Sequence, residues 1–206
     1  MKNYRLKSIY NETFSGLKLF YRDTHLPDNL ILNYRVGQII QEKDFTDMSS
    51  FGEGLSENFR YLIASAHAKD LSIFNPNSAK IGHFLIDTLA YFKVLDILTI
   101  EDKTQILLLN IPDNSLTLFK NSSSNLEEEI TEKARDNFIN KKNSLLIPEL
   151  QTKDWKERTK SPIGINDNGV MFFDDSKIKM ESPKRIEINM DKKTIEVNKK
   201  PWWKIW

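Results

Sequence analysis

Histidine and carboxylate side chains are the groups in this sequence best suited to acid–base chemistry. The chain has three histidines, His25, His67 and His83; Asp70 follows the second by three residues and Asp87 follows the third by four. A histidine held by a carboxylate can act as a general base, so either segment could supply a base and its orienting group. Such spacing is common in charged sequences and favours surface or core histidines over a catalytic pair. No His-x-x-x-His pattern is present, so a zinc site is not predicted.

A second arrangement of charged residues would suit a metal-dependent nuclease. Such an enzyme holds its metal with an aspartate and a second acid, and a lysine two residues after that acid assists the attacking water. Asp87 followed by Glu101 and Lys103 has this spacing. The acid-x-Lys pattern recurs at residues 154–156, 175–177 and 191–193, as chance would produce in a chain with 29% charged residues. The nuclease is therefore an alternative interpretation.

Other catalytic and cofactor motifs are missing from the sequence. The chain has no cysteine, which excludes disulfides, thiolate metal sites and cysteine nucleophiles. It has no Gly-x-Ser-x-Gly elbow. The segment Gly52-Glu53-Gly54 lacks the third glycine and the Lys-Ser/Thr pair of a phosphate-binding loop. The sequence therefore predicts no cofactor and no resident metal.

The end of the chain carries the sharpest compositional signal. Trp202, Trp203 and Trp206, which are three of the four tryptophans, lie beside Lys204 in the last five residues. Large aromatic rings are costly to leave in water, so something should cover them. We predict that these four residues bind a partner protein. The alternatives are that the tail folds back on its own core, or that it docks at a membrane interface.

Charge and hydropathy narrow the classes of function. Lys and Arg number 30 and Asp and Glu number 29, so the net charge of +1 gives no general attraction to nucleic acid. The most apolar stretch, residues 84–109, is interrupted by charged residues and does not reach the roughly 20 apolar residues that a bilayer span needs. No apolar signal-peptide segment follows the basic start. We expect a cytoplasmic protein that binds another protein rather than nucleic acid.

One helix is clear from its pattern. Residues 125–141 repeat apolar side chains every four positions from Leu126 to Phe138, which gives one packing stripe. Ser124 or Asn125 can cap this helix. Glutamates in its first turn and lysines at its end complement the helix dipole.

The rest of the chain predicts mainly strands. Apolar runs bounded by turn residues predict strands at residues 4–10, 17–21, 30–40, 59–65, 81–86, 92–100 and 105–111, with a helical turn at 66–74. One helix over residues 81–98 is the alternative, but β-branched and aromatic residues favour strands. Later strands are predicted at residues 170–173, 177–180, 185–190 and 194–197, the last two as a hairpin.

Together these elements predict an α+β fold, in which a mostly antiparallel sheet is covered by one amphipathic helix and followed by a C-terminal β-hairpin appendage. The composition changes after Pro148. We therefore place an α+β core domain at residues 1–150 and a C-terminal β extension with the basic-aromatic tail at residues 151–206.

For function, the lack of catalytic motifs and the aromatic tail favour a non-enzymatic bacterial interaction protein. An immunity or adaptor protein that binds and blocks a partner is an example. The abundance of Lys, Asn and Ile is typical of AT-rich bacterial coding sequences. The alternatives are a metal-dependent hydrolase or nuclease using Asp87, Glu101 and Lys103, and a peripheral membrane module that docks through its tryptophans.

Overall fold

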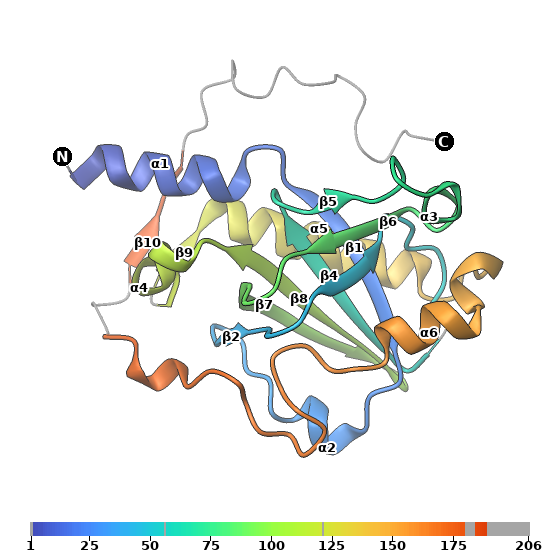
Figure 1. Cartoon of the computed structure of the whole chain (residues 1–206). Coiled ribbons are helices and arrows are strands. Elements are labelled where there is room, and N and C mark those ends of the chain that lie inside the picture. Colours follow the sequence, from blue (N-terminus) through green and yellow to red (C-terminus); the bar gives the residue numbers. More distant parts are fainter. Residues whose placement is uncertain (1, 56, 121, 180–183, 189–206) are drawn as a thin grey trace.

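A computed structural model describes residues 2–55, 57–120, 122–179 and 184–188 of the protein (Figure 1). Its strands are β1 (Lys18–Thr24), β2 (Ile39–Gln41), β3 (Thr46–Ser49), β4 (Phe59–Ser65), β5 (Lys69–Asp70), β6 (His83–Ile86), β7 (Tyr91–Ile100), β8 (Lys103–Ile111), β9 (Ser122–Ser124) and β10 (Lys184–Ile186). Its α-helices are α1 (Lys2–Phe14), α2 (Asp28–Ile31), α3 (Pro76–Lys80), α4 (Leu116–Lys120), α5 (Asn125–Lys141) and α6 (Lys153–Thr159). Short 3-10 helices are η1 (Asp113–Ser115), η2 (Pro148–Gln151) and η3 (Asp175–Lys177).

The strands form one large sheet and one small one. The large sheet has eight strands in the order β2-β7-β8-β4-β1-β3-β6-β5. Its neighbouring strands run antiparallel except β4 and β8, which pair in parallel. The small sheet pairs β9 with β10 in parallel. The predicted α+β fold with a mostly antiparallel sheet is thus confirmed.

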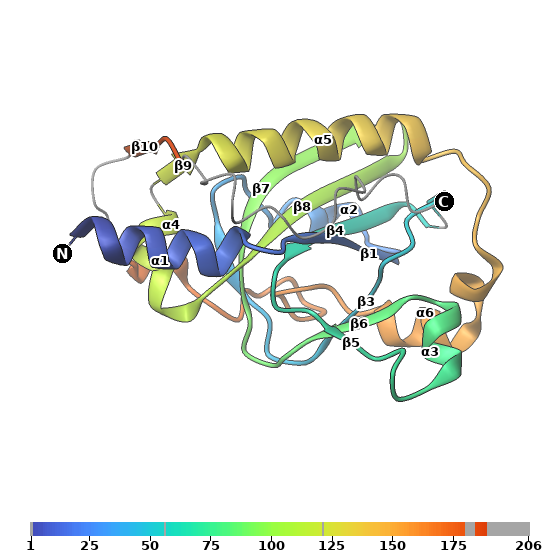
Figure 2. The same cartoon turned by 90° about the horizontal axis from the view of Figure 1, so that it is seen from above.

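The sheet lies between two layers. Helix α5 covers one face, and α6 with the chain that follows it lies on the other (Figure 2). Under α5, Leu62 and Leu107 pack with Ala134 of the helix. On the opposite face, a larger core includes Tyr61, Ile63 and Ile106 together with Ile163 and Ile165 from the segment after α6. Because side chains of a strand alternate between faces, β4 contributes to both cores and is buried along its whole length.

Helix α5 begins and ends as the sequence predicts. The Ser124 side chain accepts a hydrogen bond from the Glu127 amide, and the Glu127 side chain accepts one from the Ser124 amide, which is a capping box. The helix is also tied to the sheet, because the Arg135 guanidinium donates two hydrogen bonds, of 2.8 and 2.6 Å, to the Asp96 carboxylate of β7. The helix is held at its start by its own cap and along its length by the sheet.

The central strands were predicted with the right type. Strand β4 matches residues 59–65, and β6, β7 and β8 lie at the three apolar runs that follow, so residues 81–98 do not form one helix. Their aromatic and β-branched side chains are buried in the sheet, where branched side chains pack well. Residue Glu101 turns the β7–β8 hairpin with a positive φ of 59°.

Several sequence predictions are wrong in the N-terminal region. Residues 4–10 belong to helix α1, because Tyr10 and Phe14 pack against Phe119 with ring centroids 5.6 and 6.4 Å apart. A helix brings side chains four residues apart onto one face, which this aromatic cluster requires. Residues 30–40 contain the end of α2 and the start of β2 rather than one strand, and residues 66–74 contain β5 rather than a helical turn.

The chain after α6 has little regular structure. An isolated bridge joins Ile165 and Met171. Of the strand predicted at residues 177–180, Lys177 ends η3, residues 178–179 form no strand, and residue 180 lies outside the described part of the chain. The predicted hairpin is described only at its start, where β10 pairs with β9; residues 189–206 lie outside the described part of the chain. The domain boundary near residue 150 stays a prediction. Among the described residues, no helix combines the length and apolar character needed to cross a membrane.

Candidate functional site

A histidine and a carboxylate meet on the face of the sheet near α6. Strands β3 and β6 pair antiparallel, with Ser49 opposite His83. The Nε2 atom of His83 lies 2.6 Å from Oδ1 of Asp47, and their side chains are only 7% and 15% exposed. A carboxylate on one ring nitrogen fixes the orientation of an imidazole and leaves the other nitrogen for a second partner. This pair has the geometry of a general base and its orienting acid.

Helix α6 covers this pair. Thr152 caps the helix by accepting a hydrogen bond from the Trp155 amide. The Trp155 ring lies 5.3 Å from the imidazole of His83, centroid to centroid, and perpendicular to it. One turn later, Nη1 of Arg158 is 3.8 Å from Oδ1 of Asp47. The helix thus places an aromatic ring and a cation on the His83–Asp47 pair.

A buried arginine lies next to the same strand. Arg22 of β1 is 4% exposed and donates from Nη1 to the Asp47 carbonyl (3.3 Å) and from Nη2 to the Ser161 carbonyl (2.8 Å). Burial lowers the pKa of this guanidinium, and the nearby Tyr61 and Glu42 act in the opposite direction. Its Nε donor has no hydrogen-bond partner within the described part of the chain. Buried donors are normally paired, so this buried N–H is an unsatisfied polar group next to the His83–Asp47 pair.

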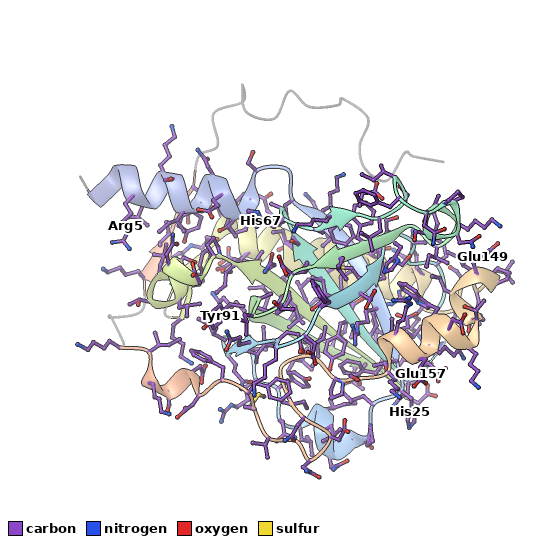
Figure 3. The ribbon with its side chains drawn as sticks, viewed as in Figure 1. Arg5, His25, His67, Tyr91, Glu149 and Glu157 are labelled. Carbon is purple, nitrogen blue, oxygen red and sulfur yellow. The ribbon has the colours of Figure 1, made fainter. Side chains whose placement is uncertain are left out.

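Two hollows open beside α6. The larger has a volume of about 150 Å³ and is lined by Asp23, Thr24, His25, Glu57, Lys156, Thr159 and Lys160. The smaller is lined by Tyr21, Asp23, Phe51, Leu150, Trp155 and Lys156. In Figure 3, His25 lies at this end of the molecule together with Glu157, a residue of α6.

The charged side chains of these hollows are largely engaged with one another. Asp23 accepts two hydrogen bonds, of 2.6 and 2.8 Å, from Arg60, and Lys156 donates to Glu57 at 2.7 Å. The Arg60 guanidinium also donates to the carbonyls of Gly52 and Gly54. Asp23 therefore serves to hold a buried arginine, and the His83–Asp47 pair remains the better candidate for chemistry.

The residues predicted for a metal-dependent nuclease do not meet. Asp87 precedes β7, where its carboxylate lies 3.5 Å from Lys69. Glu101 and Lys103 follow β7, and the ten residues of that extended strand span about 30 Å. There Glu101 pairs with Lys142 at 2.9 Å, and Lys103 donates to the Lys142 carbonyl. No group of three potential metal ligands occurs in the part of the chain that the structure covers.

The histidine predictions hold only in part. His83 does meet a carboxylate, but it is Asp47 rather than Asp87, which lies at the far end of β6. His67 is exposed and lies well apart from His25 (Figure 3). Asp47 lies in β3, which was not among the strands predicted from the sequence. Trp202, Trp203, Lys204 and Trp206, predicted to bind a partner, lie outside the described residues.

Comparisons with known proteins give matches in structure only. No protein family matches the sequence, and no curated protein matches it. Among solved structures, the type III effector XopAI from Xanthomonas axonopodis pv. citri matches with a TM-score of 0.41 and 18% identity, over 49% of this chain and 46% of its own. The ADP-ribosyltransferase HopU1 of Pseudomonas syringae pv. Tomato matches with a TM-score of 0.39 and 16% identity, over 46% of this chain and 45% of its own.

Exoenzyme S from Pseudomonas aeruginosa, solved in complex with human 14-3-3 protein beta and bound to Carba-NAD, matches with a TM-score of 0.38 and 14% identity. That match covers 50% of this chain and 53% of exoenzyme S. The matched region therefore spans about half of each of these three neighbours. At such TM-scores the likeness does not carry an argument about the reaction, so the chemistry has to be argued from the side chains.

The neighbours nevertheless correct one expectation. We expected a non-enzymatic immunity or adaptor protein, whereas the neighbours named above are a bacterial effector, an ADP-ribosyltransferase and a bacterial exoenzyme. These neighbours contradict the expectation of a non-enzymatic binding protein, and the chain is similar to each of them over about half its length.

Proposed function

We propose that this chain is an enzyme whose active centre is the His83–Asp47 pair. The observation that carries the proposal is the 2.6 Å contact between the His83 imidazole and the Asp47 carboxylate, which come from paired strands and are largely removed from solvent. A carboxylate held against one ring nitrogen orients the imidazole, and the imidazole can then take a proton from a substrate or from water.

The pair supports transfer of a group to water or to a hydroxyl. His83 would remove the proton of the attacking oxygen as the bond between the transferred group and the rest of the donor breaks. Asp47 would stabilise the imidazolium that forms, and the imidazolium would then give its proton to the departing group or to water. The Trp155 ring lies perpendicular to His83 and would form one wall of the path by which a substrate reaches that ring.

The first donor to test is NAD, because ADP-ribosyl transfer is the reaction that the neighbours' names suggest; the proposal itself rests on the pair. NAD consumption is measured for the wild-type chain, for His83→Gln and for Asp47→Asn. Removing a general base costs about 10²–10⁴-fold in rate, so His83→Gln should lose the activity by about that factor. The matched control is His67→Gln, an exposed histidine that should leave the rate unchanged.

The outcomes test separately whether NAD is the donor and whether the His83–Asp47 pair is the active centre. If the wild-type chain does not consume NAD, NAD is not its donor. If consumption is as fast in folded His83→Gln as in the wild type, the pair is not the active centre. Loss of activity in both histidine variants would indicate general damage and would also count against the proposal.

A further inference from the structure

The segment after α6 is held to the sheet in an unusual way. We call residues 160–165 the strap. Side chains of the sheet and its loops form five hydrogen bonds with the backbone of the strap. Three strap carbonyls accept hydrogen bonds: that of Lys160 from Thr24 Oγ1 (3.1 Å), that of Ser161 from Arg22 Nη2 (2.8 Å) and that of Ile163 from Tyr34 Oη (2.7 Å). Two strap amides donate: that of Ile163 to Tyr61 Oη (3.1 Å) and that of Gly164 to Glu42 Oε2 (2.8 Å). The strap is thus held through hydrogen bonds to its main chain, in the way that peptide-binding proteins hold a bound peptide.

The side chains that bind the strap are held in place by the surrounding fold. Tyr34, Glu42, Tyr61 and Arg22 are each less than 9% exposed, and they come from separate parts of the chain. The second carboxylate oxygen of Glu42 accepts from the amides of residues 43 and 44, at 2.8 and 3.0 Å, which fixes its orientation. Groups whose orientation is already fixed lose little freedom when a ligand binds.

The strap also has a side-chain signature. Ile163 and Ile165 are each 1% exposed and pack in the main core. Between them, Gly164 has a φ of +80°, and a Cβ there would lie 2.9 Å from Cβ of Ile40. Only glycine fits that position without strain or displacement. The surface is therefore selective for an apolar-Gly-apolar sequence.

From these contacts we infer that Arg22, Thr24, Tyr34, Glu42 and Tyr61 form a binding site for a polypeptide segment that bends at a glycine, which the chain's own strap fills as an internal ligand. The external ligand is a segment of another polypeptide that carries an apolar residue, a glycine in the left-handed conformation and a second apolar residue. It binds when the strap is released and takes over the same five hydrogen bonds. The inference stands whether or not the His83–Asp47 pair is catalytic.

Hydrogen exchange on the full wild-type chain tests whether the strap is separable from the core. The amides of Ile163 and Gly164 should exchange through an opening that leaves the amides of β4 and β8 protected, and so at least about tenfold faster than these. If they exchange only with global unfolding, at the rate and denaturant dependence of β4 and β8, the strap belongs to the core and the inference is wrong.

Peptide binding tests the site itself. In the full chain, Ile163→Asp places a charge in the core position and should release the strap. A fluorescently labelled peptide of residues 157–168 should then bind saturably to this variant. It should bind at least about tenfold more weakly to the wild type, where the tethered strap competes at high effective concentration. The matched control variant is Val170→Asp, whose side chain is 60% exposed and which should behave as the wild type.

A second peptide tests the selectivity. The same peptide with Gly164→Ala should not bind the Ile163→Asp variant. The inference is overturned if this variant is folded by circular dichroism and binds neither peptide, or if it binds both equally. If Ile163→Asp does not fold, the hydrogen exchange of the wild type decides.

Discussion

The hydroxyl oxygens of Tyr34 and Tyr61 lie 2.7 Å apart and close a ring of hydrogen bonds on the backbone of Ile163. The Ile163 amide donates to Tyr61, and Tyr34 donates to the Ile163 carbonyl. This leaves the hydroxyl hydrogen of Tyr61 for the oxygen of Tyr34. All of these groups are buried, so this ring replaces the hydrogen bonds that they would make with water.

Removing one hydroxyl should therefore destabilise the protein. Tyr61→Phe leaves the buried Ile163 amide without its acceptor, and an unsatisfied buried group costs about 1–3 kcal/mol. We expect the free energy of unfolding, measured by urea denaturation, to fall by that amount. Tyr91→Phe is the control, because that tyrosine is partly exposed and packs edge-on against Phe173. A similar loss in both variants would contradict the importance of the ring.

The same tyrosines predict how stability depends on alkaline pH. Burial raises the pKa of Tyr61 to about 12 from 10.0, and burial also raises the pKa of Tyr34. At a pH between 10.0 and about 12, Tyr61 loses its proton in the unfolded chain and keeps it in the folded protein. The contribution is thus fully present below pH 10 and is lost as the pH rises through about 12. For Tyr61 two pKa units correspond to about 3 kcal/mol.

Urea unfolding at several pH values between about 9 and 11.5 checks this expectation, because an unfolded tyrosine loses its proton in this range and a folded Tyr61 keeps it. The free energy of unfolding should fall with pH in the wild type and fall less steeply in Tyr61→Phe, which retains Tyr34. Parallel profiles for the two proteins would show that Tyr61 is not held neutral by the fold.

The start of α5 offers a second stability test. Ser124→Ala removes the side chain that accepts from the Glu127 amide, and loss of such a cap costs about 1 kcal/mol. Ser123→Ala is the matched control, because Ser123 is exposed and lies one residue before the cap. Thermal unfolding should separate the two variants. Equal melting temperatures would mean that the sheet, through Asp96 and Arg135, holds α5 without help from its cap.

A comparison of Gly164 with Gly16 separates the cost of a left-handed backbone from the cost of a close side-chain contact. Gly16 and Gly164 have nearly the same φ, +75° and +80°, but a Cβ at residue 16 meets nothing within 4 Å, whereas one at residue 164 meets Ile40. Gly16→Ala should cost about 1 kcal/mol, for the left-handed backbone alone. Gly164→Ala should cost about 1–3 kcal/mol more, because it overpacks the core. Urea denaturation of both variants measures the difference, and equal losses would exclude the close contact.

The sequence alone determined the elements whose signals are local. Helix α5 could be predicted to the residue, because its capping serine, its charge order and its apolar stripe all lie within one segment. Strands β4, β7 and β8 could be predicted because buried central strands are apolar along their length. Helix α1 was missed, because its aromatic face makes sense only against Phe119, more than 100 residues away.

Only the tertiary structure decided the candidate sites. His83 and Asp47 stand 36 residues apart and meet because β3 and β6 pair, with a register that no local pattern specifies. The strap lies 102 residues from Tyr61 and 129 from Tyr34 along the chain. Hydrogen bonds over such separations depend on how the whole chain folds back on its sheet. Local composition therefore set the helices and central strands, whereas long-range pairing placed the histidine on its carboxylate and the strap on its tyrosines.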